Sequence, residues 1–263
     1  MKLFFIVLFL FLSSINPASI NPAHAVDASG DNLFFKANRL YFKGEFEAAV
    51  KTYESILKNY NSELLFYSES CGELFYNTGN CYFRLGKKGK AVLNYERARL
   101  FMPRDDDLKY NIEYLQDMLE DNIPQKKNII SDIFGVNFFS RTEIALLFCL
   151  VNCLLFLFLS IRIFLKTEWT FYLVNIFLIF WIVSGVSFCI MLKETTFDDR
   201  AVILEKEVDV LAGPDKKDTL LFKVHEGTMA YYEKNESNFS LIRLPDGQRG
   251  WLISSAIETI RTN

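Results

Sequence analysis

Long apolar runs alternate with charge-rich amphipathic stretches along this chain, and the alternation divides it into parts. A short apolar run occupies residues 3–12, and charged residues are frequent in 36–130 and 193–263. Between these two regions, residues 144–192 are almost uniformly apolar. This distribution predicts soluble parts on both sides of a membrane-embedded part, rather than one soluble globule.

Two apolar segments, 144–165 and 171–192, make up the embedded part. Each contains about 22 residues, and a helix of that length extends about 33 Å, which is enough to cross the hydrocarbon of a bilayer. The short segment 166–170 allows only a tight turn, so we expect a transmembrane helical hairpin. Arg162 and Lys166 place this turn in the cytoplasm, because basic residues are enriched in cytoplasmic loops.

Polar residues inside the two apolar segments fall at matching depths. Counting from the outer ends of an antiparallel hairpin puts Asn152 level with Ser184, and Ser160 level with Asn175. We expect hydrogen bonds between the helices at these two levels, with Gly185 allowing close approach. The alternative is that these residues face a membrane partner or a buried pathway.

Residues 1–25 have the organisation of a secretory signal peptide. Lys2 precedes an apolar core that is too short to span a bilayer comfortably, and Ala23-His24-Ala25 ends the polar stretch that follows. We expect cleavage after Ala25 and export of the N-terminal part. An uncleaved anchor is the alternative.

A pattern of small, aromatic and apolar residues occurs twice between Leu33 and Pro103, and it matches the tetratricopeptide repeat, which forms two antiparallel helices. Small residues stand where the helices cross, and a glycine stands at each turn. The two copies consist of Leu33, Ala37, Leu40, Gly44, Phe46, Ala49, Tyr53 and Ile56, and of Phe75, Gly79, Tyr82, Gly86, Ala91, Tyr95, Ala98 and Pro103. Their spacing exceeds the standard period by about eight residues, so we expect an insertion around residues 64–71.

A further helix is expected after Pro103, from Asp105-Asp106-Asp107 to about Asn122, because acidic residues stabilise a helix N-terminus. It caps the repeats and completes a helical domain over 31–122. Such a domain presents a short groove, and its candidate partner-binding residues are Phe34, Asn38, Tyr41, Tyr76, Asn77, Asn80, Phe83, Arg84 and Asn111. Their amides suit a peptide backbone and Arg84 suits an acidic group. The alternative is that Asn77 and Asn80 satisfy neighbouring helices.

Residues 123–143 connect the helical domain to the hairpin. Pro124 ends the capping helix. Residues 130–139 alternate apolar and polar side chains with several phenylalanines, which predicts either a segment that lies on the membrane surface or an ordinary loop.

Short β-prone runs separated by turn signals fill residues 200–263. Five runs in about sixty residues predict a small barrel. The stretches 213–214, 225–228 and 246–252 resemble a bacterial SH3-like domain. In such a domain Trp251 either lines a peptide groove or belongs to the barrel wall.

The sequence contains few sets of residues that could act in catalysis or bind a metal. His225 is the histidine that remains after the expected cleavage, and we assign it a structural role because it lacks catalytic partners. No nucleophile–base set, metal cluster or phosphate loop can be assembled, so we expect no enzymatic activity, no cofactor and no metal. A net charge of −3 without a basic patch argues against nucleic acid as a partner. Cys71 and Cys81 would lie about 15 Å apart on one helix, so we expect no disulfide.

The order of these parts, together with residues 76–86, 90–98, 225–228 and 246–252, resembles the BatE-like proteins of the Bat (aerotolerance) operon. The resemblance implies a multidomain protein of the bacterial inner membrane, with α-helical repeats, a transmembrane helical hairpin over 144–192 and an all-β SH3-like domain. It also implies that both soluble domains are periplasmic, that the partners are other Bat membrane proteins, and that the complex is linked to oxidative stress tolerance. We therefore expect a scaffold or adaptor. The alternative is a cell-wall protein that binds peptidoglycan through the SH3-like domain.

Overall fold

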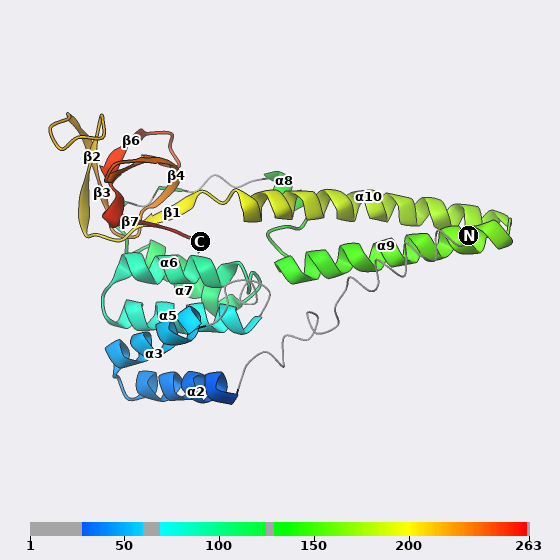
Figure 1. The fold of residues 1–263 in the computed structure, drawn as a ribbon, viewed down its shortest axis with the longest axis horizontal. Coiled ribbons are helices and arrows are strands. Elements are labelled where there is room, and N and C mark those ends of the chain that lie inside the picture. The colour runs from blue at the N-terminus through cyan, green and yellow to red at the C-terminus, as the bar shows by residue number, and fades with distance from the viewer. Residues whose placement is uncertain (1–27, 60–68, 122, 125–128, 262–263) are drawn as a thin grey trace. The chain divides into compact units, whose positions relative to one another are not determined.

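The structure is a computed structural model that describes residues 28–59, 69–121, 123–124 and 129–261. It divides into two compact units, and the division falls between Ser68 and Glu69 (Figure 1). The expected signal peptide and most of the expected insertion around 64–71 lie outside the described residues.

The first unit contains a helical pair, α2 (Ala28–Phe42) and α3 (Phe46–Asn59). Ala37 and Ala49 are fully buried, as expected for small residues at a helix crossing. Gly44 stands at the turn with a φ of +80°, a left-handed conformation that glycine adopts without a steric cost.

The second unit begins with a similar pair, α5 (Glu69–Arg84) and α6 (Lys88–Arg99), which pack against each other. Gly79 lies directly against Tyr95, since a Cβ atom at Gly79 would stand 2.6 Å from the Tyr95 ring. Gly86 repeats the turn geometry of the first pair with a φ of +70°.

The same side-chain hydrogen bond occurs within each helical pair. The hydroxyl of Tyr53 donates to the side-chain oxygen of Asn38, and the hydroxyl of Tyr95 donates to that of Asn80 at 2.7 Å. In both pairs the partners are 15 residues apart in the sequence. The internal similarity of the sequence therefore corresponds to the same side-chain interaction in two places.

Helix α7 (Asp106–Gln116) follows, and it packs against α6 through the buried Leu108 and Leu115. The side chain of Asp105 caps it by accepting a hydrogen bond from the Leu108 N–H at 2.7 Å. The expected helix was longer and reached about Asn122. It ends earlier because the residues after it bind a turn of the C-terminal sheet instead of continuing the helix.

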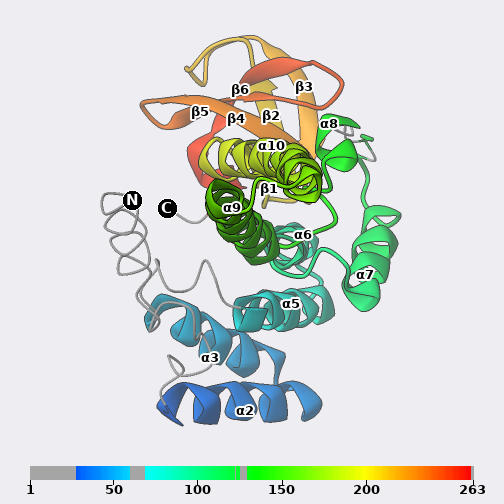
Figure 2. The same ribbon diagram turned by 90° about the vertical axis from the view of Figure 1, so that its right-hand side faces the viewer.

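The connector contains a short helix, α8 (Ile129–Ile133), followed by a turn at Gly135. The long helices α9 (Arg141–Phe164) and α10 (Glu168–Thr196) then lie side by side (Figures 1 and 2). Ser140 and Glu143 form a capping box at the start of α9. Both helices are long and apolar enough to cross a membrane.

The expected hydrogen bonds between the two long helices are wrong in their partners. Asn152 does bond across the hairpin, but it accepts from the Trp181 indole N–H at 3.1 Å, whereas Ser184 donates to the Trp181 carbonyl. Ser160 and Asn175 each donate to the carbonyl four residues earlier in their own helix. Such local bonds satisfy a polar side chain without a second helix, so equal depth alone does not determine pairing.

The C-terminal part, described up to residue 261, contains seven antiparallel strands in one sheet, in the order β3-β2-β6-β5-β4-β1-β7. The strands are β1 (Arg200–Ile203), β2 (Glu207–Leu211), β3 (Leu220–His225), β4 (Met229–Glu236), β5 (Phe239–Arg243), β6 (Arg249–Ile253) and β7 (Ile257–Thr259). The expected five strands were too few, because β6 lies in a stretch that was assigned to a motif and β7 is short.

This sheet is not closed among the described residues, so the expected small barrel is corrected to an open sheet with β3 and β7 at its edges. One face carries the core, which consists of Ile203, Val208, Val210, Val224, Ala230, Ile242, Leu244, Leu252 and Ala256. The last residue of β3, His225, pairs with Glu207 of β2 and donates its backbone N–H to the Asp121 carboxylate outside the sheet.

Candidate functional site

Side chains of α5, α6 and α7 form a hydrogen-bonded amide cluster. The Asn111 side-chain nitrogen donates to the Tyr76 hydroxyl at 2.9 Å and to the Asn80 side-chain oxygen at 3.3 Å. The same Asn80 oxygen accepts from the Tyr95 hydroxyl. Asn80 therefore links neighbouring helices, which is the structural alternative considered for it. The network fixes three helices relative to each other.

The surface along α5 beside this cluster changes in charge from one end to the other. Burial raises the pKa of the Tyr76 hydroxyl, the hydrogen bond with Asn80 opposes the rise, and the carboxylates of Asp107 and Asp105 add to it. Arg84 lies about 12 Å further along α5, at 1.5 Å per residue, and is exposed. A ligand that runs along α5 would therefore meet acidic groups near Tyr76 and a guanidinium at the other end.

Exposed aromatic rings continue the surface beside the cluster. The ring of Phe83 meets Tyr114 edge-on at 6.0 Å, and Tyr114 stacks on Tyr110 at 6.2 Å. Tyr110 and Tyr114 are 66% and 49% exposed. We call the combined surface the α5–α7 face, and it consists of Tyr76, Asn80, Phe83, Tyr110, Asn111 and Tyr114.

Tyr110 and Tyr114 were not among the expected binding residues. Tyr110 and Tyr114 stand four apart on α7 and so share a helix face, and Tyr114 also stands three residues after Asn111, which was expected there. That spacing is the signal that identifies them.

The remaining candidates of the helical region lie elsewhere. Asn38 and Tyr41 belong to the first unit, where Asn38 accepts from Tyr53 and the Tyr41 ring contacts Phe46 edge-on at 5.4 Å. Asn77 lies half-buried on α5. The cluster thus unites Tyr76, Asn80 and Asn111 of the expected set.

Arg97 of α6 ties the helices to the sheet. Its Nε donates to the Ile260 carbonyl at 2.9 Å. Its Nη2 donates to the Thr259 carbonyl at 2.8 Å and to Glu258 at 2.9 Å. Burial lowers the pKa of Arg97, and the Glu258 carboxylate opposes this change. The guanidinium is therefore held by one carboxylate and two carbonyls that follow or belong to β7.

Glu96 extends this connection. It is 1% exposed and forms ion pairs with Arg99 at 2.6 Å and with Arg200 at 3.6 Å. Arg200 begins β1 and also pairs with Asp198 at 2.7 Å. Although burial disfavours the charge of Arg200, hydrogen bonding to Asp198 and the charges of Asp198 and Glu96 raise its pKa. We call these contacts of Glu96 and Arg97 the α6–sheet junction.

A second connection joins the segment after α7 to the β3–β4 turn. The Asp121 carboxylate accepts from the backbone N–H of His225 and from the Thr228 hydroxyl, both at 2.7 Å. The imidazole Nε2 of His225 lies 3.2 Å from Glu120. Burial alone would raise the pKa of Asp121, but the hydrogen bonds from Thr228 and His225 lower it overall. The hydrogen bond with Asp121 raises the pKa of His225.

Trp251 on β6 packs with Leu211, Phe239 and Leu241, and it is 8% exposed. The ammonium of Lys234 lies over its ring at 4.9 Å. This placement is that of a wall residue, one of the two alternatives expected for Trp251.

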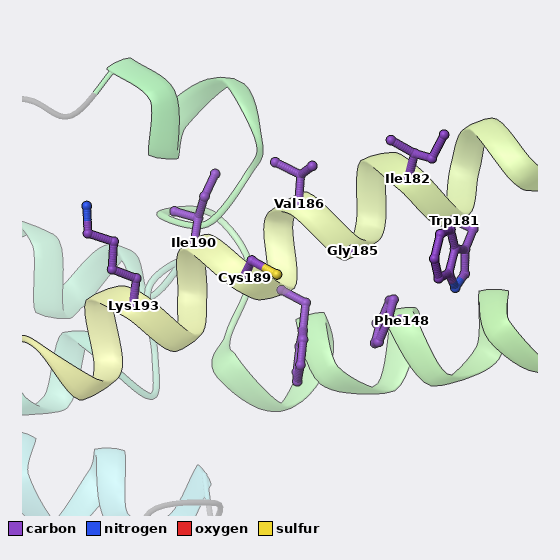
Figure 3. A pocket seen from close by; sticks show the side chains of 9 residues that line it. Phe148, Trp181, Ile182, Gly185, Val186, Cys189, Ile190 and Lys193 are labelled. Carbon is purple, nitrogen blue, oxygen red and sulfur yellow. The ribbon is translucent and has the colours of Figure 1, made fainter.

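The described part of the second unit has hollows on its surface. One of about 590 Å³ lies between the α5–α6 turn and the β1–β2 turn and is lined by lysines and glutamates, among them Lys87, Lys90 and Glu226. Another, of about 620 Å³, runs along α10 beside Phe148 and Trp181 (Figure 3). Within the described residues, no three His, Cys, Asp or Glu side chains are arranged to hold a metal ion.

Cys71 and Cys81 both lie on α5, and both are buried and are not joined in a disulfide. Burial raises the pKa of Cys81 to about 12. A thiol of this kind stays protonated and is a poor nucleophile.

No family model matches the sequence, and no curated protein or solved structure gives a match. The α5–α7 face is thus the candidate site on the evidence of its own residues.

Proposed function

We propose that this chain is a membrane-anchored adaptor without catalytic activity, which binds a segment of a partner protein at the α5–α7 face. The observation that carries the proposal is the combination of exposed Tyr110 and Tyr114 rings with a hydrogen-bonded amide cluster beside them. Tyrosine supplies large contact area at a small entropic cost, and a surface fixed in advance loses little freedom on binding.

The distribution of charge specifies the segment further. Asp105 and Asp107 lie near Tyr76, whereas Arg84 lies toward the other end of α5. A partner segment that carries a basic residue about 12 Å from an acidic residue would complement both ends. Its backbone N–H groups would meet the side-chain oxygen of half-buried Asn111, because the Asn111 nitrogen already donates to Tyr76 and Asn80.

The anchoring part of the proposal rests on α9 and α10. Their apolar side chains are widely exposed in the absence of lipid, which is typical of helices that face a bilayer. We place the turn between them in the cytoplasm and both soluble parts in the periplasm, on the basis of Arg162 and Lys166. The Arg162 guanidinium lies 4.8 Å from the Phe171 ring centre, an aromatic contact at the turn.

The identity of the helical repeats, of the sheet domain and of the partner is part of the same proposal. The repeated Asn–Tyr contact supports two tetratricopeptide repeats, and the small antiparallel sheet supports an SH3-like domain. With the resemblance to BatE-like proteins, we propose that the partner is another membrane protein of a Bat complex linked to oxidative stress tolerance. Peptidoglycan binding through Trp251 has less support, because that ring is buried.

Affinity capture from membranes with the full-length chain tests the adaptor. The test variant is Tyr110→Ala/Tyr114→Ala, because Asn80→Ala would also remove a contact that holds α6. Phe197→Ala is the matched control, since Phe197 is an exposed aromatic residue outside the face. A partner that is recovered with wild type and with the control, and lost with the double variant, supports the proposal. Equal recovery with all three chains would exclude the face as the binding site.

A further inference from the structure

The connector before α9 carries an unusual density of exposed apolar side chains. Ile129 and Ile133 of α8 are 70% and 74% exposed, and Ile130, Phe138 and Phe139 are also exposed. The same segment also has exposed polar side chains, where Asn137 donates to Asp132 at 2.6 Å. We call residues 129–139 the wedge.

Two contacts fix the wedge against α10. The Ser131 hydroxyl donates to the Glu194 carboxylate, and the Ser187 hydroxyl donates to the Phe134 carbonyl at 3.0 Å. Figure 1 shows α8 beside the C-terminal part of α10. The part of the wedge from Ser131 to Phe134 therefore runs along α10 from the level of Glu194 to the level of Ser187.

These contacts define a depth in the bilayer. Ser187 lies five residues inside the apolar segment 171–192, which corresponds to about 7.5 Å along a helix. The opposite helix gives a similar level, because Phe148 of α9 stacks on Phe188 at 5.0 Å and the apolar segment of α9 begins at Ile144. Amphipathic helices on membranes bury their apolar face by about 5–10 Å.

We propose that the wedge inserts into the outer leaflet, with Ile129, Ile130, Ile133, Phe138 and Phe139 among the lipid acyl chains. This inference rests on the proposed membrane insertion of α9 and α10. Lipid is the occupant that the geometry favours, because the exposed apolar surface continues directly from the two long apolar helices, at levels that run from Glu194, just outside segment 171–192, to Ser187, five residues inside it.

The wedge also reaches the helical part of the unit. Arg104, in the link between α6 and α7, forms an ion pair with Glu143 at 2.5 Å. Its guanidinium lies 5.3 Å from the Phe138 ring centre and 5.9 Å from that of Phe139. Insertion of the wedge would therefore hold α7 at the membrane surface, and the partner segment bound there would be one that lies close to the bilayer.

Site-directed spin labelling of the full-length chain in phosphatidylethanolamine–phosphatidylglycerol vesicles tests this inference. The five native cysteines are replaced by alanine, and single cysteines are introduced as Ile133→Cys, Asp132→Cys and Leu157→Cys. Oxygen partitions into hydrocarbon and a nickel chelate stays in water. The ratio of their collision rates should be several-fold higher at 133 than at 132, and high at 157 in the middle of α9.

The three labelled positions distinguish the insertion of the wedge from the proposed membrane insertion of α9 and α10. A water-exposed label at 157 overturns the membrane insertion of the hairpin. A lipid-exposed label at 157 with a water-exposed label at 133 overturns the wedge alone. If the cysteine-free chain does not insert, photoreactive lipid is cross-linked to the native chain, and labels within 129–139 support the wedge whereas labels confined to α9 and α10 contradict it.

Discussion

The carboxylate of Asp121 contacts His225 twice: Oδ2 accepts the backbone N–H at 2.7 Å, and Oδ1 lies 3.0 Å from the imidazole Nδ1. The two residues are 104 positions apart in the sequence. Their contact joins the segment after α7 to the β3–β4 turn, so the helices and the sheet of the second unit are not independent domains on a loose linker.

Asp121→Ala should loosen this turn. The variant leaves the His225 N–H and the Thr228 hydroxyl without their acceptor, at a cost of about 2 kcal/mol. Hydrogen exchange at residues 225–228 should accelerate by about 30-fold if it follows local opening. Glu205→Ala, an exposed carboxylate on a neighbouring turn, serves as the control. Unchanged protection in Asp121→Ala would show that the contact contributes nothing to local stability.

The same contact should depend on pH. The pKa of His225 is raised, so its contribution is complete below the ordinary histidine value of about 6.5 and is lost as pH rises through the folded value. The pKa of Asp121 is lowered, so its contribution is complete above about 4 and is lost as pH falls through the folded value. Glu120 and Glu207 also favour the charged imidazole.

The difference in thermal midpoint between wild type and His225→Gln measures this dependence. It should be largest between about pH 4 and pH 6.5 and shrink as the pH rises beyond that window. A difference that stays constant from pH 5 to pH 9 would mean that the charge of His225 does not matter.

Arg97→Ala should destabilise the α6–sheet junction more than Glu258→Ala. Removal of Arg97 leaves the carbonyls of Thr259 and Ile260 without a donor, and Ile260 is buried, so we expect a loss of about 2 kcal/mol. Glu258 is half-exposed, and its removal leaves the two carbonyl contacts of Arg97 in place. Hydrogen exchange in β1 and β7 provides the measurement, and equal effects of the two variants would contradict this ranking.

Gly79→Ala should disturb the second helical pair. The added methyl group would stand 2.6 Å from the Tyr95 ring, so the ring must move away from its hydrogen bond with Asn80. Overpacking of this kind costs about 1–3 kcal/mol. Gly44→Ala is an informative control, because nothing lies within 4 Å of its Cβ position and only the left-handed backbone is strained. Circular dichroism on heating should show that Gly79→Ala loses its helical signal at a lower temperature than Gly44→Ala does.

Local patterns predicted most helices correctly, because their evidence lies in neighbouring residues. Gly44 and Gly86 both stand at turns with positive φ, and both apolar segments became long helices. The predicted end of α7 was wrong, because the end depends on the contact of Asp121 with His225, far along the chain.

The candidate site was predicted only in part for a similar reason. Tyr76 and Asn111 could be assigned from the repeat pattern, and the structure joins them by a hydrogen bond. The exposure of Tyr110 and Tyr114 depends on how α7 packs against α6, which the pattern does not specify. The Trp181–Asn152 bond likewise depends on helix rotation, whereas depth alone had indicated Ser184.

Only three residues separate the end of α10 at Thr196 from the start of β1 at Arg200. Because β1 and β7 are ion-paired to α6, which packs against α7, a short link and direct contacts connect α10 to the helix that carries Tyr110 and Tyr114. Under the proposed anchoring and partner binding, tension in a bound partner would pass from α7 through α6 and β1 to α10 and would turn the hairpin in the bilayer.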